Sequence, residues 1–236
     1  MNRIEFIRNE EKKYHDYCYE NFSLFEEGSW LFKPVKTLID LLPLFESVDN
    51  VQVLDLGCGV GRNSIPIAEA VQKKNGKVMC VDLLDSALIR LIEYSKKFGV
   101  EEVIQPIKAD IGKYKIITNE YDLIVAVSTL ERVESPEKLE YVVRKMAQGT
   151  KQNGINCIIV NSEATEIDIE TNEILDAQIE VNLTTEEMIQ IVSSVYIGWE
   201  VLKTTVKPLA YSITRNEKNI LLKTNAITFV VRKLNC

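Results

Sequence analysis

The sequence is poor in the residues that build metal centres and disulfide frameworks. Its 236 residues include a single histidine, His15, and no CxxC pair. The five cysteines are scattered along the chain: Cys18, Cys58, Cys80, Cys157 and Cys236. We therefore expect neither a structural zinc site nor a disulfide-stabilised secreted fold, and we assign no metal. A reducing, cytoplasmic environment is the prediction.

Long apolar segments are also missing, and so is an excess of positive charge. No stretch approaches the length of a membrane span, and the charged opening MNRIEFIRNEEKK argues against a signal peptide. The 28 Lys and Arg residues against 35 Asp and Glu residues give a formal net charge of −7. Because this charge repels a polyanion on average, nucleic acid is a disfavoured partner and a small molecule is the expected one. None of these features indicates an oligomeric state.

Short apolar runs alternate with helical patterns through the first two thirds of the chain. Runs typical of buried parallel strands occur at residues 51–56, 77–81, 103–107, 121–127 and 154–160. The intervening helices include one capped by Asp85 or Ser86 and one with Ser135 as cap and Pro136 in its first turn. The alternation predicts an α/β fold with a doubly wound, mostly parallel, Rossmann-like sheet covered on both faces.

The two ends of the chain depart from this pattern. The aromatic segment at residues 14–25 is typical of a short helix, and Pro34 suits the first position of the next one. Thr184 and Glu187 form a capping box for a helix, and strands are expected at residues 199–206, 211–214 and 226–231, with a hairpin turn at 216–219. We predict one domain over residues 1–236, made of an N-terminal helical cap (1–33) and a seven-stranded core with a C-terminal antiparallel hairpin (34–236).

The first expected strand ends in a glycine-rich turn within VLDLGCGVGRNS, from Val53 to Ser64. Gly57, Gly59 and Gly61 permit strained backbone angles and close approach of a ligand, at the edge where open parallel sheets bind ligands. The alternative is that these glycines only make a tight turn. Asp55 favours a ligand site, because an acid inside a strand is costly to bury without a hydrogen-bond donor or a cation.

Two further acids follow the next strands. Asp82 ends the second strand, roughly 20 residues after the glycines, where an acid can accept hydrogen bonds from ribose hydroxyls. Asp110 follows the third strand, where its carboxylate can accept from an adenine amino group while Ile111 packs on the ring. Each acid alone has the alternative of an ordinary loop carboxylate or helix cap. Together they predict an adenosine-containing ligand.

Two such ligands compete for this site. The G-x-G-x-x-G fingerprint of dinucleotide sites fails, because the sixth position counted from Gly57 is Arg62. The observed spacing is D-x-G-x-G-x-G. Together with Asp110, it favours S-adenosylmethionine (SAM) over NAD.

At these residues the chain resembles the class I SAM-dependent methyltransferases. The segment LDLGCGVGRNSIPIA, from Leu54 to Ala68, is similar in particular to the tellurite-resistance (TehB-like) small-molecule methyltransferases. The resemblance to the superfamily extends from about Val51 to Val160. The longer N-terminal segment and the acidic stretch at residues 162–180 depart from the compact family pattern, so the family does not define the acceptor.

The resemblance implies roles for individual residues. Asp55 and the three glycines would surround the methionine part of SAM, Asp82 the ribose, Asp110 and Ile111 the adenine, and Ser128 would lie near the reactive methyl. Trp30 and Lys33 match an aromatic and a basic residue of related enzymes, with the alternatives that Trp30 is a core anchor and Lys33 a solvated charge. The remaining residues predicted to line the cofactor site are Cys58, Asn63 and Leu83.

The predicted chemistry is transfer of a methyl group from SAM to a small molecule, leaving S-adenosylhomocysteine (SAH). Positioning dominates such a reaction, and the catalytic residue is left unassigned. If a base is needed, the weak candidates are His15, Tyr14, Tyr19 and Glu131. The [DN]-P-P-[YFW] element of amino-methylating enzymes is missing after the fourth strand, where the chain continues as Ser128-Thr129-Leu130. The alternatives are a SAM-binding sensor or interaction protein without transfer activity and a nicotinamide-dependent oxidoreductase.

Overall fold

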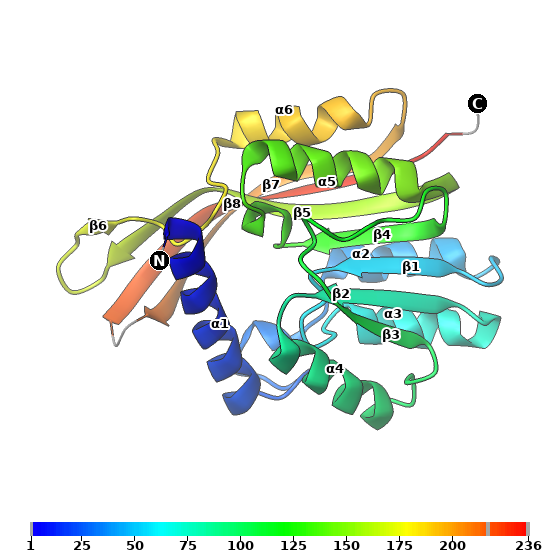
Figure 1. Cartoon of the computed structure of the whole chain (residues 1–236), viewed down its shortest axis with the longest axis horizontal. Helices are drawn as coiled ribbons and strands as arrows, with labels where there is room; N and C mark the ends of the chain where they lie inside the picture. The colour runs from blue at the N-terminus through cyan, green and yellow to red at the C-terminus, as the bar shows by residue number, and fades with distance from the viewer. Residues whose placement is uncertain (1, 216–217, 235–236) are drawn as a thin grey trace.

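One mixed β-sheet forms the centre of the molecule (Figure 1). The structure is a computed structural model that describes residues 2–215 and 218–234. Its eight strands follow the order β3-β2-β1-β4-β5-β8-β7, with β6 paired to β5. The strands are β1 (Gln52–Leu56), β2 (Lys77–Asp82), β3 (Ile104–Lys108), β4 (Tyr121–Val127), β5 (Thr150–Asp168), β6 (Ile174–Leu175), β7 (Glu200–Arg215) and β8 (Lys218–Arg232).

Helices cover both faces of the sheet, because successive strand residues point to opposite faces. Val53 packs in a core with α2 (Lys36–Leu41), α3 (Ser64–Val71) and α4 (Asp85–Lys97), whereas Leu54 packs in a second core with α5 (Pro136–Gly149) and α6 (Thr185–Val195). The strands β1 to β5 pair in parallel and β7 and β8 are antiparallel. The predicted α/β class, the Rossmann-like sheet and the C-terminal antiparallel hairpin are therefore confirmed.

Several boundaries differ from the sequence prediction. The sheet has eight strands rather than seven, because β6 adds a two-residue pairing to β5. The strands expected at 199–206 and 211–214 form one strand, β7. The helix expected to start at Pro34 begins at Lys36, and Leu84 caps α4 without a side-chain hydrogen bond in place of Asp85 or Ser86. Of the turn expected at 216–219, residues 216–217 lie outside the described residues.

The expected caps of two other helices are confirmed. Ser135 Oγ accepts from Lys138 N at the start of α5, and Thr184 and Glu187 form the capping box of α6. Short 3₁₀ turns complete the chain as η1 (Trp30–Phe32), η2 (Leu42–Phe45), η3 (Gln72–Lys74) and η4 (Leu130–Arg132). Of the helices in the described part of the chain, none is long and apolar enough to cross a membrane.

The N-terminal segment is one long helix, α1 (Arg3–Asn21), rather than a short helix within residues 14–25. Asn2 and Glu5 form a capping box that starts it. The helix lies between α4 and the long strands β5, β8 and β7, which extend past the parallel part of the sheet (Figure 1). It therefore lies on the side to which the carboxyl ends of β1 to β4 point.

Candidate functional site

The candidate site is built on the loops that follow β1, β2, β3 and β4. The sheet order reverses beside β1, whose neighbours are β2 and β4. Doubly wound folds bind their ligands at the carboxyl ends of the strands beside such a reversal. Four residues predicted to bind the cofactor lie in or shortly after these four strands: Asp55, Asp82, Asp110 and Ser128.

Asp82 ties the end of β2 to the glycine-rich turn. Its Oδ2 accepts a hydrogen bond from Gly59 N at 2.8 Å, and its Oδ1 accepts from Leu84 N at 2.9 Å. Each carboxylate oxygen has a second lone pair that can accept a further hydrogen bond. The following side chain, Leu83, is 43% exposed and offers an apolar surface beside the carboxylate.

The three glycines of the turn have different surroundings, although all have positive φ. A Cβ on Gly57 would lie 2.3 Å from Thr129 Oγ1, and a Cβ on Gly61 would lie 2.6 Å from Leu91 Cδ1. Packing against the Thr129 side chain therefore requires glycine at position 57, whereas at Gly61 the φ of 95° adds to the contact with the end of the Leu91 side chain. A Cβ on Gly59 would instead meet the Tyr19 hydroxyl at 3.3 Å, so Gly59 faces α1.

Asp55 is buried under the turn. Its Oδ2 accepts a hydrogen bond from Ser64 Oγ at 2.5 Å. Burial raises the pKa of Asp55 to about 6, with the Ser64 hydrogen bond and the Arg62 charge opposing this shift. Its donor is thus a hydroxyl at the start of α3 rather than a turn amide.

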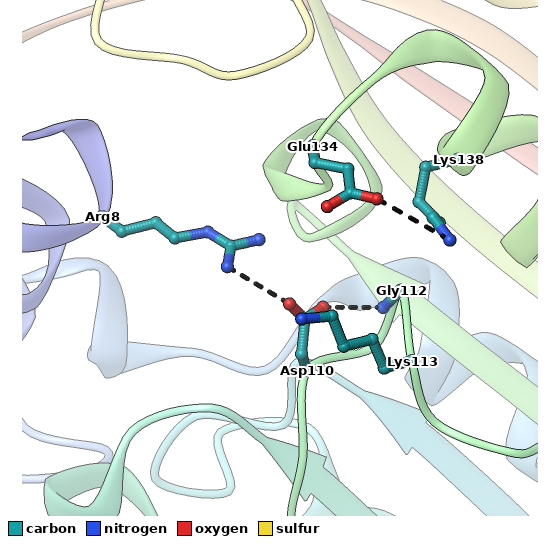
Figure 2. Close-up of a pocket in the computed structure, with 6 residues that line it drawn as sticks. All are labelled: Arg8, Asp110, Gly112, Lys113, Glu134 and Lys138. Carbon is teal, nitrogen blue, oxygen red and sulfur yellow. Dashed lines mark hydrogen bonds and ion pairs between the residues drawn. The ribbon is translucent and has the colours of Figure 1, made fainter. Parts of the chain in front are cut away.

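Asp110 is held from two sides after β3. Its Oδ1 accepts from Gly112 N at 2.8 Å, and its Oδ2 forms an ion pair with Arg8 at 3.2 Å. Figure 2 shows the Arg8 side chain reaching from α1 to this carboxylate. Ile111 is buried next to it. The adenine role of Asp110 stays a prediction.

An aromatic cluster from α1 and η1 covers the glycine-rich turn. The His15 ring lies 5.6 Å from the Tyr19 ring and 5.7 Å from the Trp30 ring, measured between centroids. The Arg62 guanidinium lies 5.1 Å from the Trp30 ring centroid and donates to the Trp30 carbonyl oxygen at 3.0 Å. Trp30 is half-buried in this cluster, whereas Lys33 is exposed, with its ammonium 4.5 Å from the Phe32 ring centroid.

Two other predicted cofactor residues have partners within the protein. Asn63 is buried and its Oδ1 accepts from Val35 N at 3.0 Å, which joins the turn to the start of α2. Cys58 is buried beside Cys80, and burial raises the pKa of its thiol well above the ordinary value. Their roles toward a cofactor stay predictions.

The four base candidates differ sharply in environment. Burial raises the pKa of both Tyr14 and Tyr19, which disfavours their phenolate forms. His15 Nε2 lies 3.4 Å from Glu11 Oε2. Glu131 is 1% exposed, so its carboxylate is not solvated.

Sequence reasoning missed a buried ionic network beneath α1. Glu11 Oε1 lies 3.2 Å from an Arg132 nitrogen and 3.3 Å from an Arg215 nitrogen. Although burial by itself raises the pKa of Glu11, Arg132, His15 and Arg215 together lower it to about 2. The network brings α1, η4 and β7 together, and the only local signal for it was the spacing of Glu11 and His15 on one helix face.

Part of this chain is similar in sequence to known proteins. Residues 53–154 match the model of a family described as methyltransferase domain. A carboxy-S-adenosyl-L-methionine synthase from Shewanella oneidensis is 29% identical over 106 residues, which is 45% of this chain and 42% of that protein. A ubiquinone biosynthesis O-methyltransferase from Hydrogenovibrio crunogenus is 25% identical over 107 residues, again 45% and 42%. The chain thus spans less than half the length of these curated relatives.

Solved structures show the same fold at low sequence identity. TehB from Haemophilus influenzae has a TM-score of 0.61 and 21% identity, covering 93% of this chain and 66% of that one. A SAM-dependent methyltransferase from Methanosarcina mazei has a TM-score of 0.58 and 16% identity, covering 86% and 99%. The Rossmann-like methyltransferase fold of this chain follows from these matches.

Proposed function

We propose that this chain, which carries a methyltransferase domain with the Rossmann-like fold, transfers the methyl group of SAM to a small-molecule acceptor. The observation that carries the proposal is the placement of Asp82 and Asp110 after adjacent strands, beside a turn with three glycines at positive φ. The proposal includes action in the cytoplasm and treats residues 1–33 as a cap on a single domain.

The described residues fit the parts of SAM. Asp82 retains one free lone pair on each carboxylate oxygen after accepting from Gly59 and Leu84, which suits the two ribose hydroxyls. The exposed Leu83 side chain supplies apolar surface for the adenine, and Asp110 supplies an acceptor for its amino group. The names of both curated relatives refer to SAM chemistry or methyl transfer, which supports the donor and leaves the acceptor open.

The chemistry asks for positioning more than for covalent catalysis. SAM supplies a methyl group that is already electrophilic, because it is bonded to a positively charged sulfur. The protein would then hold the ligand at the ends of β1, β2 and β3 and exclude water with the cap formed by Tyr19, His15 and Trp30.

Calorimetric titration tests the donor assignment. The protein is expected to bind SAM and SAH and not NAD, and Asp82→Ala is expected to weaken SAM binding by about 10- to 100-fold through loss of hydrogen bonds to a charged acceptor. Asp85→Ala is the matched control, because Asp85 is an exposed neighbour paired with Lys108. Binding of NAD in place of SAM, or an unchanged affinity in Asp82→Ala, would contradict the proposal.

Stability must be measured in the same variant. Asp82→Ala leaves the Gly59 and Leu84 amides without their acceptor, which costs about 1–3 kcal/mol for each one that stays unpaired. Urea unfolding of Asp82→Ala and Asp82→Asn separates this loss of stability from the loss of SAM affinity.

A transfer assay distinguishes an enzyme from a SAM sensor. Labelled SAM is incubated with the protein and a panel of small metabolites, and transfer to none of them despite tight SAM binding would favour the sensor.

A further inference from the structure

Several buried side-chain atoms on α1 and on the segments that pack against it have no hydrogen-bond partner. Seven buried side-chain atoms in residues 2–215 and 218–234 have no hydrogen-bond partner. Five of them belong to this region: Arg8 Nε, His15 Nδ1, Glu131 Oε2, Glu180 Oε2 and Arg215 Nε. Because buried polar groups are normally paired, this concentration points to a polar ligand rather than to a packed core.

The arginines of the region are already matched by carboxylates. Arg132 pairs with Glu11 and, at 3.6 Å, with Glu180. Arg215 pairs with Glu11 and, at 3.4 Å, with Glu166. A ligand that only offered negative charge would therefore have to compete with carboxylates that are in place.

Glu131 is the exception in this region. Within the part of the chain that the structure describes, no cation lies within ion-pair distance of its carboxylate. Its Oε1 accepts from Asn161 Nδ2 at 2.5 Å and from Asn161 N at 3.3 Å, while its Oε2 has no partner and the residue is 1% exposed. Glu180 Oε2, the other unpartnered acceptor, still lies 3.6 Å from an Arg132 nitrogen, so Glu131 Oε2 is the one with neither a hydrogen bond nor an ion pair among the described residues.

The position of Glu131 relates it to the expected methyl group. Asn161 Nδ2, which donates to Glu131, also donates to Ser128 Oγ at 3.2 Å. Ser128 is exposed at the carboxyl end of β4 and has a left-handed φ of 52°. The Glu131 carbonyl accepts from Val181 N at 3.0 Å, so η4 is fixed from a second side. One amide group therefore separates the Glu131 carboxylate from the edge of the cofactor site.

We propose that Glu131 is the catalytic base, and that the methyl acceptor is a small molecule with a neutral N–H or O–H group that this carboxylate binds. The inference rests on the proposed methyl transfer. In the step, the acceptor N–H or O–H bond breaks and its proton passes to Glu131. The acceptor nitrogen or oxygen forms the bond to the methyl carbon, and the carbon–sulfur bond breaks with its electron pair going to sulfur.

The electrostatic surroundings support this role. Burial raises the pKa of Glu131 above its ordinary value, with the Arg132 charge and the Asn161 hydrogen bonds opposing the shift. A raised pKa makes the carboxylate a better proton acceptor. Arg132 on η4 is the charged group that acts on Glu131, and Tyr211 on β7 is in turn affected by Glu131, Arg132 and Glu11 on α1. Tyr211 also has a pKa raised by burial, which keeps its hydroxyl protonated.

The first test uses the charge difference between SAM and SAH and needs no acceptor. A carboxylate near a sulfonium favours the cation, so wild type is expected to bind SAM more tightly than SAH. Glu131→Gln, which keeps the shape of the side chain, is expected to reduce this preference by about tenfold. Glu163→Gln is the control, because Glu163 is exposed and hydrogen-bonds to Thr185 N and Asn225 Nδ2. An unchanged SAM-to-SAH ratio in Glu131→Gln would overturn the proposal, whereas failure of wild type to bind either ligand would refute the methyltransferase function itself.

The second test measures pH dependence and transfer. The SAM preference of wild type is expected to decrease as pH falls through the pKa of Glu131, and that of Glu131→Gln to be independent of pH. Methyl transfer is then measured with methyl-labelled SAM and a panel of small phenols, primary amines and thiols. The rate of transfer to phenols or amines is expected to be more than a hundredfold lower in Glu131→Gln than in wild type. Transfer to thiols alone, or equal transfer rates in wild type and Glu131→Gln, would show that Glu131 is not the base.

Discussion

Two buried carboxylates of this molecule show how the number of neighbouring cations decides a pKa. Asp55 has one hydroxyl donor and the more distant Arg62 charge, and its pKa rises to about 6. Glu11 is also removed from water, but Arg132, Arg215 and His15 surround it, and its pKa falls to about 2. Burial alone therefore does not predict the charge state. Asp55 costs stability when ionised, and Glu11 contributes stability when ionised.

Asp55→Asn is expected to stabilise the protein at neutral pH. The folded pKa of Asp55 lies above its ordinary value of 3.8, so the folded state holds its proton more tightly than the unfolded state. Stability from this group is present below pH 4 and is lost as pH rises to about 6, by about 3 kcal/mol. Urea unfolding of both proteins should show the variant gaining on wild type between pH 4 and pH 7. A difference that does not change with pH would contradict this account.

The residues that sequence predicted well are those whose role is local. Asp82 and Asp110 could be placed because each directly follows an apolar strand, and parallel strands end at one edge. The contacts of Glu11 could not, because Arg215 lies 204 positions away and reaches it only through the extension of β7. Short-range sequence patterns carry no information on contacts between residues that lie so far apart in the sequence.

At the scale of elements, α1 is the feature that sequence described least well. Only a short helix within residues 14–25 was expected, yet α1 also carries Arg8 and Glu11, which pair with residues of the loops and strands beneath the helix. The Asn2-x-x-Glu5 spacing was the available signal, since it forms the observed capping box. Further links join α1 and the segment after it to α4, through Asp16 with Ser86 and through Leu24 N with Tyr94 Oη at 3.0 Å. The cap is therefore docked at both ends by polar contacts.

Glu11→Gln is expected to loosen α1 at neutral pH. The depressed folded pKa means that Glu11 contributes stability above its ordinary value of 4.5, which is lost as pH falls through about 2. The size of this contribution is about 3 kcal/mol. Hydrogen exchange followed by mass spectrometry should show faster exchange of the amides of α1 in the variant, with little change in β1 and β4.

Glu20→Gln provides the control for this measurement, because Glu20 is exposed on the same helix. It should exchange like wild type. If Glu11→Gln left the protection of α1 unchanged, the ionic network would not be what docks the cap, and the apolar contacts of Ile7, Cys18 and Tyr19 would have to account for it.

For the whole molecule, the long antiparallel strands explain both the success and the failure of the sequence prediction. The parallel order could be inferred from alternation, but β7 was expected as two strands, at residues 199–206 and 211–214. In the sheet, Pro208 lies opposite Asn225 within an unbroken edge strand, where one side of the backbone faces no neighbour. A proline is tolerated there because its missing N–H removes no hydrogen bond on the open side. The acidic stretch at residues 162–180 is also ordered: residues 162–168 end β5, residues 174–175 form β6, and the carbonyl oxygens of Ala177 and Ile179 accept from Arg3 on α1.

The single-domain proposal predicts one cooperative unfolding transition. Residues from both ends share one apolar core, which includes Tyr19 and Leu24 near the N-terminus and Val230 on β8. The strands β5 and β8 join the parallel sheet to the C-terminal hairpin along most of their length. Scanning calorimetry should therefore give a calorimetric enthalpy of about 165 kcal/mol that equals the van't Hoff value.

Binding of SAH provides a second check of the single domain. SAH at about 100 times its dissociation constant should stabilise the folded state by about 2.7 kcal/mol without splitting the unfolding transition. Two resolved transitions, with only one shifted by SAH, would show instead that the C-terminal hairpin and its loop unfold as a separate unit.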